Sequence, residues 1–474
     1  MRTHDLVVIG AGSGNMVVDD RFSGLDVAIV DDRKFGGTCV NHGCIPSKML
    51  SYAAQVADLV AGAADFDINI DINTGTDFRR RAFARGAEPR LRWTALRDRV
   101  FDRTDAVAAA GEQGRRDSDF VTVYKGHARF TEPGRLRVSV DGDTVDVAAG
   151  RIVVAAGGRP VVPDVVVESG LPYQTSDTVM RLDAAPAHLA VLGGGYIAAE
   201  LAHVFSAAGS RITVIEKSDR LLGGPHDDTV RDVYTELARS RYDLRCGSEI
   251  ADITGTAGDL SIHLDDGSTV RADMLLVATG RRSNSDRLDV EKGGIDTHQD
   301  GRIVVDRHCR TTADGVFALG DVSTAVPLKH VANREATVVQ HNLLHPDDLR
   351  AVNHDLVPSA VFTQPQIAAI GRTEKDCRDD GLDYRVGLAH YSDVAYGWAM
   401  RDESGLCKVL ITVDGQILGA HVIGPQAATL IQIFVVAMNF GIRADELAAR
   451  PYWIHPALTE VVENALIDLG KDQA

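Results

Sequence analysis

Residues 36–48 read Gly36-Gly37-Thr38-Cys39-Val40-Asn41-His42-Gly43-Cys44-Ile45-Pro46-Ser47-Lys48, so four residues separate two cysteines flanked by glycines and a lysine. The run follows a glycine loop, Gly10-Ala11-Gly12-Ser13-Gly14-Asn15. A Cys-x4-Cys pair in this position is typical of a redox-active disulfide that faces a flavin. Two inert thiols or half of a zinc site are the alternatives. Zinc would require a second Cys/His pair at a short spacing, and none is evident, so we favour the redox disulfide.

Two stretches follow the order strand, glycine loop, helix, strand, acid that is typical of dinucleotide binding. In the first, predicted strands Leu6–Ile9 and Val27–Val30 flank the glycine loop, and Asp31 follows the second strand. The glycines let backbone N–H groups approach a pyrophosphate, while the acid binds the ribose hydroxyls. Asn15 holds the third glycine position of the motif, where we expect it to crowd the helix against the strand.

The second stretch contains predicted strands Leu189–Leu192 and Ile212–Ile215, the loop Gly193-Gly194-Gly195-Tyr196-Ile197-Ala198, and Glu216. Two complete motifs indicate two dinucleotide sites rather than chance glycines. The cysteine pair follows the first motif. We therefore expect a flavin at the first site and a nicotinamide nucleotide at the second.

Apolar runs outside these motifs predict three further buried strands. Ile152–Ala156 ends in Gly157-Gly158-Arg159-Pro160, a predicted hinge into a second domain, and Leu275–Thr279 before Gly280-Arg281 marks the return. Val316–Leu319 ends in Gly320-Asp321. This places Asp321 at a strand end, where contacts to a cofactor are made; a turn acid or a helix cap is the alternative.

The last part of the chain has a different pattern of predicted secondary structure. Predicted strands Leu406–Val413 and Ile417–Ile423 flank Asp414-Gly415, which is typical of a hairpin. An apolar helix is predicted over Ala427–Met438. A sheet-and-helix domain of this kind forms either an oligomer interface or an ordinary core.

Composition favours a soluble enzyme of several domains. The chain has 474 residues, 50 basic and 67 acidic, and a formal net charge of -17, which discourages binding to nucleic acid or an anionic membrane. We find neither the ~18 uninterrupted apolar residues of a membrane span nor the pattern of a signal peptide. Arg79 to Arg103 is arginine-rich with interleaved acids, and predicts a solvated helical face. The other cysteines are scattered, so we expect a reducing cytoplasm: Cys246, Cys309, Cys377 and Cys407.

A candidate acid–base group lies near the C-terminus, in Trp453-Ile454-His455-Pro456-Ala457-Leu458-Thr459-Glu460. Proline is favoured at a helix start, so we expect His455 at the N-cap side and Glu460 in the first turns. A carboxylate near an imidazole fixes its tautomer and raises its basicity, as thiol–disulfide chemistry requires. The alternative, a histidine that merely caps a helix, would be the default for the other histidines.

Taken together, these features resemble the pyridine nucleotide–disulfide oxidoreductases over essentially the whole chain. Four segments are similar to one branch of that family, in which an asparagine like Asn15 is usual: Gly12–Asn15, Thr175–Met180, Asp393–Met400 and Tyr452–Leu458. The resemblance implies an α/β fold of two Rossmann-like dinucleotide-binding domains plus a C-terminal α+β dimerisation domain. We expect an FAD-binding domain over 1–152, an NAD(P)-binding domain over 153–282, a return to the central domain over 283–348 and a dimerisation domain over 349–474.

The resemblance also implies a homodimer with FAD between the domains, the nicotinamide on one face of the flavin and the disulfide on the other. Cys44 would lie nearest the flavin, and Lys48 would lie near its N5 and pair with Glu200. His455 and Glu460 would come from the opposite subunit, and Tyr196 would swing aside to admit the nicotinamide. The expected contacts are Gly10, Gly12, Gly14, Asn15, Asp31, Gly37, Thr38, Lys48, Ala156, Gly157 and Asp321 for FAD, and Gly193, Gly195, Tyr196, Ala198, Glu216, Lys217 and Gly280 for NADPH or NADH.

The implied activity is the reduction of a low-molecular-weight disulfide by NADPH or NADH through FAD. Cys39, its pKa lowered by the imidazolium of His455, would attack the substrate, because the thiolate is the nucleophile. His455 would protonate the departing thiol, and Cys44 would resolve the mixed disulfide.

Two positions depart from the family pattern. Members that use NADPH offer arginines to the 2′-phosphate, where this chain has Glu216 and Leu222. A carboxylate suits the free 2′-hydroxyl of NADH, unless Lys217 and Arg220 compensate. His42, between the cysteines, stands where an apolar residue is usual, and nothing in the sequence explains it.

Three alternative functions remain open to different degrees. Dihydrolipoamide oxidation is favoured by Glu216 and opposed by the four branch-specific segments. Reduction of mercuric ion would require another cysteine pair near the C-terminus, and no cysteine follows Cys407. A flavoprotein without turnover that serves as an assembly subunit is opposed by the intact cysteine pair and by His455 with Glu460.

Overall fold

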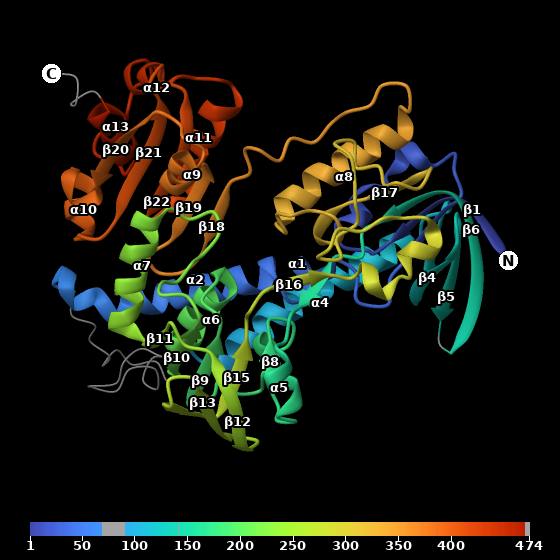
Figure 1. Cartoon of the computed structure of the whole chain (residues 1–474), viewed down its shortest axis with the longest axis horizontal. Coiled ribbons are helices and arrows are strands. Elements are labelled where there is room, and N and C mark those ends of the chain that lie inside the picture. Colours follow the sequence, from blue (N-terminus) through green and yellow to red (C-terminus); the bar gives the residue numbers. More distant parts are fainter. Residues whose placement is uncertain (69–90, 141, 470–474) are drawn as a thin grey trace, which may run out of the picture.

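A computed structural model describes residues 1–68, 91–140 and 142–469 of the chain. Figure 1 shows three α/β units: the first, at the right, is built on β1 and β6, the second, at the bottom, on β9 and β10, and the third, at the upper left, on β19 to β22. Among the described residues, every helix is too short or too polar to span a bilayer. The mixed α/β architecture agrees with the predicted fold class.

The first sheet has the strand order β3-β2-β1-β6-β5-β4, and β17 pairs with β6. Strands β1, β2 and β3 run parallel, with Val27 opposite both Leu6 and Val121. The predicted strand over Val27–Val30 is confirmed, and β1 begins earlier than predicted. The bounds are β1 (Arg2–Ile9), β2 (Val27–Val30), β3 (Val121–Tyr124), β4 (His127–Glu132), β5 (Arg135–Val140), β6 (Asp143–Val154) and β17 (Val316–Ala318).

The helix predicted after the first glycine loop is wrong. Two short 3-10 turns, η1 (Gly14–Met16) and η2 (Asp20–Phe22), take its place. The segment is rich in β-branched, Asp, Ser and Gly residues, which are poor helix formers. Arg115 holds the turn, since its guanidinium donates to the Asn15 side-chain and backbone oxygens and to the Val18 carbonyl, each at 2.7 Å. Asn15 therefore faces Arg115 and does not crowd a helix against the strand.

The second unit contains a parallel sheet of order β11-β10-β9-β15-β8 and a small antiparallel sheet β12-β13-β14. Here a true helix, α6 (Tyr196–Ala207), follows the glycine loop as predicted. The remaining bounds are α5 (Asp164–Glu168), β8 (Gln174–Thr175), β9 (His188–Leu192), β10 (Arg211–Glu216), α7 (Asp228–Arg241), β11 (Asp243–Cys246), β12 (Ile250–Thr256), β13 (Asp259–Leu264), β14 (Thr269–Ala272) and β15 (Met274–Val277).

The two predicted crossing points between these units lie side by side. Strand β7 (Gly158–Pro160) leads out of the first unit, β16 (Arg281–Ser283) leads back, and the two pair antiparallel with Gly158 opposite Ser283. The glycine-containing segments that were expected to mark a hinge and a return therefore form one two-stranded ribbon.

The third unit is an antiparallel sheet of order β18-β19-β22-β21-β20. The predicted hairpin and the apolar helix are confirmed within one residue at their ends as β21 (Leu406–Thr412), β22 (Ile417–Ile423) and α11 (Ala427–Asn439). Leu430 and Phe434 of α11 are buried in the core of this unit. The other bounds are β18 (Ser359–Val361), β19 (Ile367–Gly371), α9 (Glu374–Asp379), β20 (Tyr384–His390), α10 (Ala395–Met400), α12 (Ala444–Ala449) and α13 (Thr459–Asp468).

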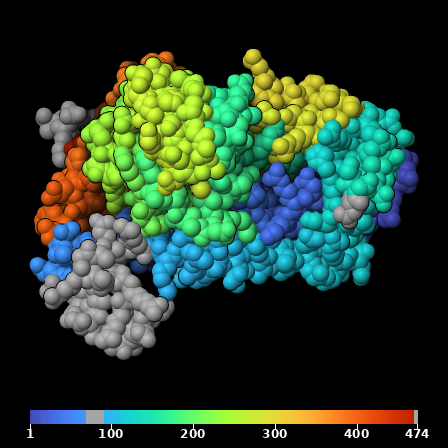
Figure 2. Space-filling view, turned by 90° about the horizontal axis from the view of Figure 1, so that it is seen from below, coloured from blue at the N-terminus to red at the C-terminus, as the bar shows by residue number. Residues whose placement is uncertain are grey.

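Two helices of the first unit pack against the second, α2 (Cys44–Ala61) and α4 (Trp93–Arg116), whereas α8 (Lys329–Leu344) packs in the core of the first unit. Leu50 of α2 and Phe205 of α6 share one buried core, and the Trp93 indole donates to the Leu182 carbonyl at 2.7 Å. In Figure 2, α4 (light blue) runs along the edge of the second unit (green to yellow). The arginine-rich segment predicted as a helical face is described only from residue 91 on, where α4 contains its second half.

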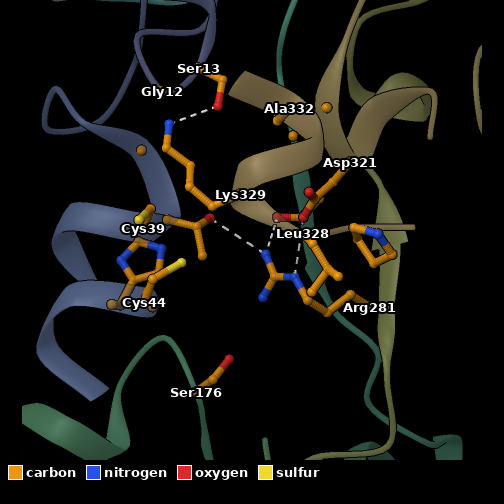
Figure 3. Close-up of a pocket in the computed structure, with 18 of the residues that line it drawn as sticks. Gly12, Ser13, Cys39, Cys44, Ser176, Arg281, Asp321, Leu328, Lys329 and Ala332 are labelled. Carbon is orange, nitrogen blue, oxygen red and sulfur yellow. Dashed lines mark hydrogen bonds and ion pairs between the residues drawn. The ribbon is translucent and has the colours of Figure 1, made fainter. Parts of the chain in front are cut away.

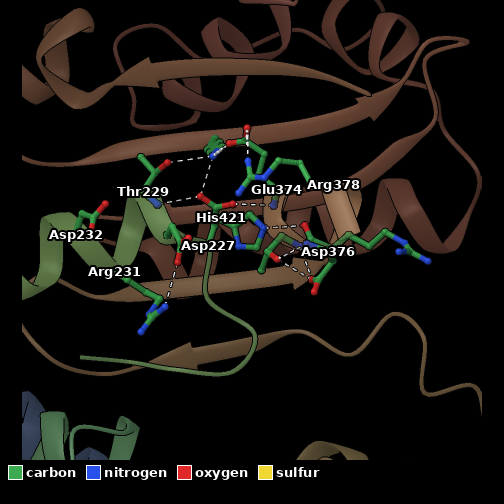
Figure 4. Close-up of polar contacts among 12 residues, drawn as sticks. Asp227, Thr229, Arg231, Asp232, Glu374, Asp376, Arg378 and His421 are labelled. Atoms are coloured by element: carbon green, nitrogen blue, oxygen red, sulfur yellow. Dashed lines mark hydrogen bonds and ion pairs between the residues drawn. The ribbon is translucent and has the colours of Figure 1, made fainter. Parts of the chain in front are cut away.

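A buried group of charges joins the second and third units. The Lys408 ammonium, on β21, contacts Asp227 at 2.8 Å and Glu374 at 2.5 Å. Asp227 caps α7 by accepting from the Thr229 N–H, and it also accepts from the Glu374 N–H at 2.8 Å. Figure 4 shows Asp227 reaching from the start of α7 toward Glu374. Burial raises the pKa of Asp227, but the bonds from Lys408 and Glu374 outweigh it and lower that pKa to about 2.

Removing the cation of this group should destabilise the protein. We expect Lys408→Met to lower the free energy of unfolding by ~3–5 kcal/mol, because it leaves the buried Asp227 carboxylate without its ammonium partner and leaves Glu374 with Arg378 as its cationic partner. Lys375→Met, which removes the exposed ion pair with Asp379, is the matched control and should cost ~0–1 kcal/mol. Urea unfolding measures both, and equal losses would contradict the role of Lys408.

The contribution of Asp227 to the free energy of unfolding should be full above the unfolded pKa of about 3.9. It should be lost as pH falls through about 2, the pKa of Asp227 in the folded protein.

Candidate active site

The two cysteines lie on consecutive helices. Cys39 is in α1 (Gly37–Asn41), and Cys44 is the first residue of α2. The chain reaches them through a turn in which Gly37, with φ +57°, lies so close to the first glycine loop that a Cβ there would be 2.8 Å from the Cα of Gly12. Glycine is therefore required at this approach. Both thiols are free, and the Cys39 thiol hydrogen-bonds to Cys44.

The electrostatics of the pair favour a thiolate on Cys44 over one on Cys39. The hydrogen bond from Cys39 lowers the pKa of Cys44 to about 7 against the effect of burial, and Lys48 contributes. The position at a helix N-terminus favours a thiolate as well. The same hydrogen bond and burial raise the pKa of Cys39 well above its usual range. The lowered pKa expected for Cys39 is therefore not found within one chain.

Lys48 and Glu200 form the predicted ion pair. The ammonium contacts both carboxylate oxygens, at 2.5 and 2.6 Å, and lies 4.7 Å from the centre of the Phe362 ring. Glu200 is only 4% exposed and also accepts from the Phe362 N–H at 2.9 Å. A buried carboxylate is stable only with such partners, so Lys48 is held beside the cysteine pair by a residue of the second unit.

The first glycine loop is built for a close backbone approach. Gly10 has φ +105°, and a Cβ there would lie 2.3 Å from the Ala155 carbonyl oxygen. Asp31 accepts from the Ala11 N–H at 2.6 Å and from the Arg33 N–H at 2.7 Å. Burial raises the pKa of Asp31 despite both bonds. The predicted ribose-binding acid thus lies against the loop that was expected to bind a pyrophosphate.

One cavity of about 1420 Å³ joins the redox pair to these elements. Small-molecule pockets are roughly 300–1,000 Å³, so this one has room for a large extended ligand. Of the predicted FAD contacts it is lined by Gly10, Gly12, Asp31, Gly37, Thr38, Lys48, Ala156, Gly157 and Asp321, together with Cys39 and Cys44. Gly14 and Asn15 lie outside the lining. A glycine-lined cradle that leads from an acid to a thiol pair fits FAD, which supplies an electron relay where it is bound.

Arg281 and Lys329 also line this cavity, and Asp177 contacts Arg281; the sequence did not identify any of the three as site residues. The Arg281 guanidinium lies 3.6 Å from Asp321 and 3.7 Å from Asp177. Figure 3 shows Arg281 and Lys329 on the same side of the cavity as Asp321, facing the cysteines. No local motif reveals Arg281 or Lys329, because their partners lie 40 or more positions away in the sequence. Only Asp177, within the segment Thr175–Met180, had a sequence signal.

His42 now has a defined environment. Its Nε2 lies 3.8 Å from the Asp177 carboxylate, and the ring is largely buried. Burial lowers the pKa of His42, and nearby arginines lower it further against the effect of Asp177. An uncharged imidazole between the two cysteines is the result.

The second nucleotide site has the geometry of the first. Gly193 has φ +105°, and a Cβ there would lie 2.6 Å from the Ala278 carbonyl oxygen. Glu216 accepts from the Gly194 N–H at 2.6 Å and from the Ser218 N–H at 2.8 Å. Of the predicted contacts, Gly195 and Tyr196 line the large cavity, with Tyr196 38% exposed. The others lie outside its lining: Gly193, Ala198, Glu216, Lys217 and Gly280.

His455 and Glu460 meet each other but not the cysteines of the same chain. The imidazole Nδ1 lies 2.7 Å from the Glu460 carboxylate, and the His455 side chain is 72% exposed. Neither residue lines the cavity in the described part of the chain. The predicted helix start at Pro456 is wrong, because α13 begins at Thr459. Glu460 accepts from the Ala457 N–H at 3.0 Å, which holds residues 455–458 in a turn before the helix.

The paired glycine loops, the cavity and the thiol pair define a flavoprotein disulfide reductase. Residues 4–336 match the family described as pyridine nucleotide-disulphide oxidoreductase, and residues 357–466 match its dimerisation domain. The chain belongs to this family and is an FAD-dependent NAD(P)H disulfide reductase that forms a homodimer.

Individual relatives agree over the whole length. The mycothione reductase of Mycobacterium tuberculosis (strain H37Rv) is 46% identical, covering 99% of this chain and 100% of the relative. The glutathione reductase of Burkholderia cepacia is 32% identical over 96% of this chain and 97% of its own. The Cu(II) complex of the HOCl-induced flavoprotein disulfide reductase RclA from Escherichia coli superposes with a TM-score of 0.84 at 25% identity, covering 98% of this chain and 99% of that one.

Proposed function

We propose that this enzyme reduces mycothione to mycothiol at the expense of NAD(P)H. The observation that carries the proposal is the 46% identity to a mycothione reductase over 99% of this chain. The geometry of the redox pair supports the reaction class. A cytoplasmic location is part of the proposal, because a reducing compartment keeps the scattered thiols free.

The proposed chemistry uses the cysteines in sequence. The Cys39 thiolate forms a bond to one substrate sulfur, the substrate S–S bond breaks, and the departing thiolate takes a proton from His455. Cys44 then displaces the second thiol, which forms the Cys39–Cys44 disulfide. Two electrons from the reduced nucleotide reopen it. Lys48, held by Glu200, contributes positive charge beside Cys44.

We further propose that each active site is shared between subunits. The Glu460-bound imidazole of His455 is exposed in one chain and remote from its cavity. Neighbouring apolar side chains are exposed as well, with Tyr452 at 104% and Ile454 at 74%. A second subunit that covers this surface would bring its own cavity to His455.

Mixed dimers test the shared site. His455→Ala and Cys39→Ser should each be inactive, and subunit exchange in an equal mixture should restore about a quarter of wild-type activity, because one site of each mixed two-fold dimer is intact. Mixing Cys39→Ser with Cys44→Ser is the matched control, in which no site regains both cysteines. Absence of recovery in the first mixture, with exchange verified by differently tagged subunits, would contradict the shared site.

The substrate is tested with a panel of disulfides. We expect kcat/KM for mycothione to exceed that for glutathione disulfide and for lipoamide by at least ~100-fold, since groups that bind a specific substrate discriminate strongly against analogues that lack them. Steady-state oxidation of the nucleotide measures all three. A preference for lipoamide would replace the mycothione proposal by the dihydrolipoamide alternative, which Glu216 favours.

We propose that NADH is used at least as well as NADPH. Glu216 lies at the end of β10, and its carboxylate would be near a 2′-phosphate, where like charges repel. Arg220 is already bound by other acids, at 3.1 Å from Asp232, 3.3 Å from Asp228 and 3.6 Å from Asp219. Lys217 is exposed. Arg220 and Lys217 could have offset the negative charge of Glu216, but neither is held beside the Glu216 carboxylate.

Glu216→Arg should shift the ratio of kcat/KM values toward NADPH by ~10-fold or more, through removal of a repulsive charge and addition of a cation. Arg220→Ala is the control and should leave the ratio unchanged, because that guanidinium is held by acids of α7. Both nucleotides are compared in steady-state assays with a saturating disulfide. A wild type that strongly prefers NADPH would overturn the assignment to Glu216.

A further inference from the structure

Three long cationic side chains line the cavity beside the cysteine pair: Lys48, Arg281 and Lys329. The first is neutralised by Glu200 at 2.5 Å. Arg281 lies between Asp177 and Asp321, at 3.7 and 3.6 Å. Both charges are therefore largely compensated before the cysteines are reduced.

Lys329 differs from these two. It is the first residue of α8, it is half-buried, and its ammonium donates to the Ser13 hydroxyl at 2.7 Å. Within the described part of the chain it makes no ion pair with a carboxylate; its electrostatic partners are Cys39, Cys44 and Asp321. Figure 3 shows the side chain passing Cys39 on its way to Ser13. A cation at the positive end of a helix is unfavourable for the helix itself, so helix stability does not explain this lysine.

We propose that Lys329 is the cation that balances the negative charge formed on the cysteine pair when its disulfide is reduced. The proposal rests on the redox role of Cys39 and Cys44. Reduction breaks the S–S bond with two electrons from the reduced nucleotide and one proton, and leaves a thiol on Cys39 and a thiolate on Cys44. That new charge arises in a half-buried place where Lys329 is the uncompensated neighbour.

The titration behaviour of these groups agrees with the proposal. Lys329 lowers the pKa of both thiols, by less than the hydrogen bond between them affects either and, for Cys44, by less than Lys48 does. Burial in turn lowers the pKa of Lys329, and the two thiols oppose that effect. Other charged or titratable groups that line this cavity near the thiols are Lys48 on α2, Arg281 on β16, Asp321 in the turn before α8, His42 at the end of α1, Tyr196 and Glu200 on α6, and His330 on α8.

The test measures the Cys44 thiolate in FAD-bound enzyme that carries Cys39→Ser, so that only Cys44 titrates. Long-wavelength charge-transfer absorbance and the iodoacetamide alkylation rate are followed against pH. Adding Lys329→Met should raise the pKa of Cys44 by about one pH unit, as loss of a nearby opposite charge does, with alkylation about ten-fold slower below that pKa. Lys329→Arg should restore the wild-type profile. Lys292→Met, which removes an exposed cation paired with Asp289, controls for net charge.

The outcomes separate this inference from the proposed function. If Cys39→Ser alone shows no thiolate at any pH, the redox role of the pair is wrong. If it shows a thiolate whose pKa is unchanged by Lys329→Met, the role of Lys329 is wrong. Loss of FAD with an unchanged pKa in the remaining holoenzyme would likewise overturn the proposal and make Lys329 a cofactor anchor. Lys329→Gln serves as the second variant if the methionine variant does not fold.

Discussion

The carboxylate of Glu200 is the point at which the three units of the chain meet. It belongs to α6 of the second unit, accepts from Lys48 of α2 in the first, and accepts from the Phe362 N–H in the segment that enters the third. A carboxylate that is 4% exposed is stable only when its charge and lone pairs are satisfied. The position of Lys48 beside Cys44 therefore depends on all three units being assembled.

The two glycine loops impose the same constraint on the two nucleotide sites. Gly10 and Gly193 both have φ +105°, and both lie where a Cβ would strike the carbonyl of the strand opposite. Each loop is then held by an acid from the neighbouring strand, Asp31 in one case and Glu216 in the other. Both acids already use their oxygens on backbone N–H groups. In the proposed preference for NADH, this fixed orientation would hold the charge of Glu216 where it repels a 2′-phosphate.

Most of the architecture could be predicted from local patterns. Strands, glycine loops, the hairpin around Asp414-Gly415 and the Lys48–Glu200 pair are encoded by short motifs or by a family resemblance. The absence of an α-helix after Gly14 was not predicted, because the motif implies a helix there while the residues that follow are poor helix formers. Helix α13 was misplaced because a side chain, Glu460, holds the preceding turn.

The residues that the sequence did not reveal have one property in common, which is that their partners are remote. Lys329 meets Ser13, and Arg281 meets Asp177 and Asp321. These contacts connect elements that neither hydrophobic periodicity nor a motif links. Charge placement around a reactive group is therefore a property of the assembled fold, whereas the glycines and cysteines are required by local geometry.

Within one chain, the charges around the pair favour a thiolate on Cys44 and a protonated thiol on Cys39. That state suits storage of electrons, because the charge lies at a helix N-terminus near cationic side chains. It does not suit attack on a substrate, which requires Cys39 to lose its proton. His455, whose imidazole contacts Glu460 of the same chain, is exposed on a different surface. In the proposed shared site, electron storage is organised inside one subunit, while the base that activates Cys39 would come from the second subunit of the dimer.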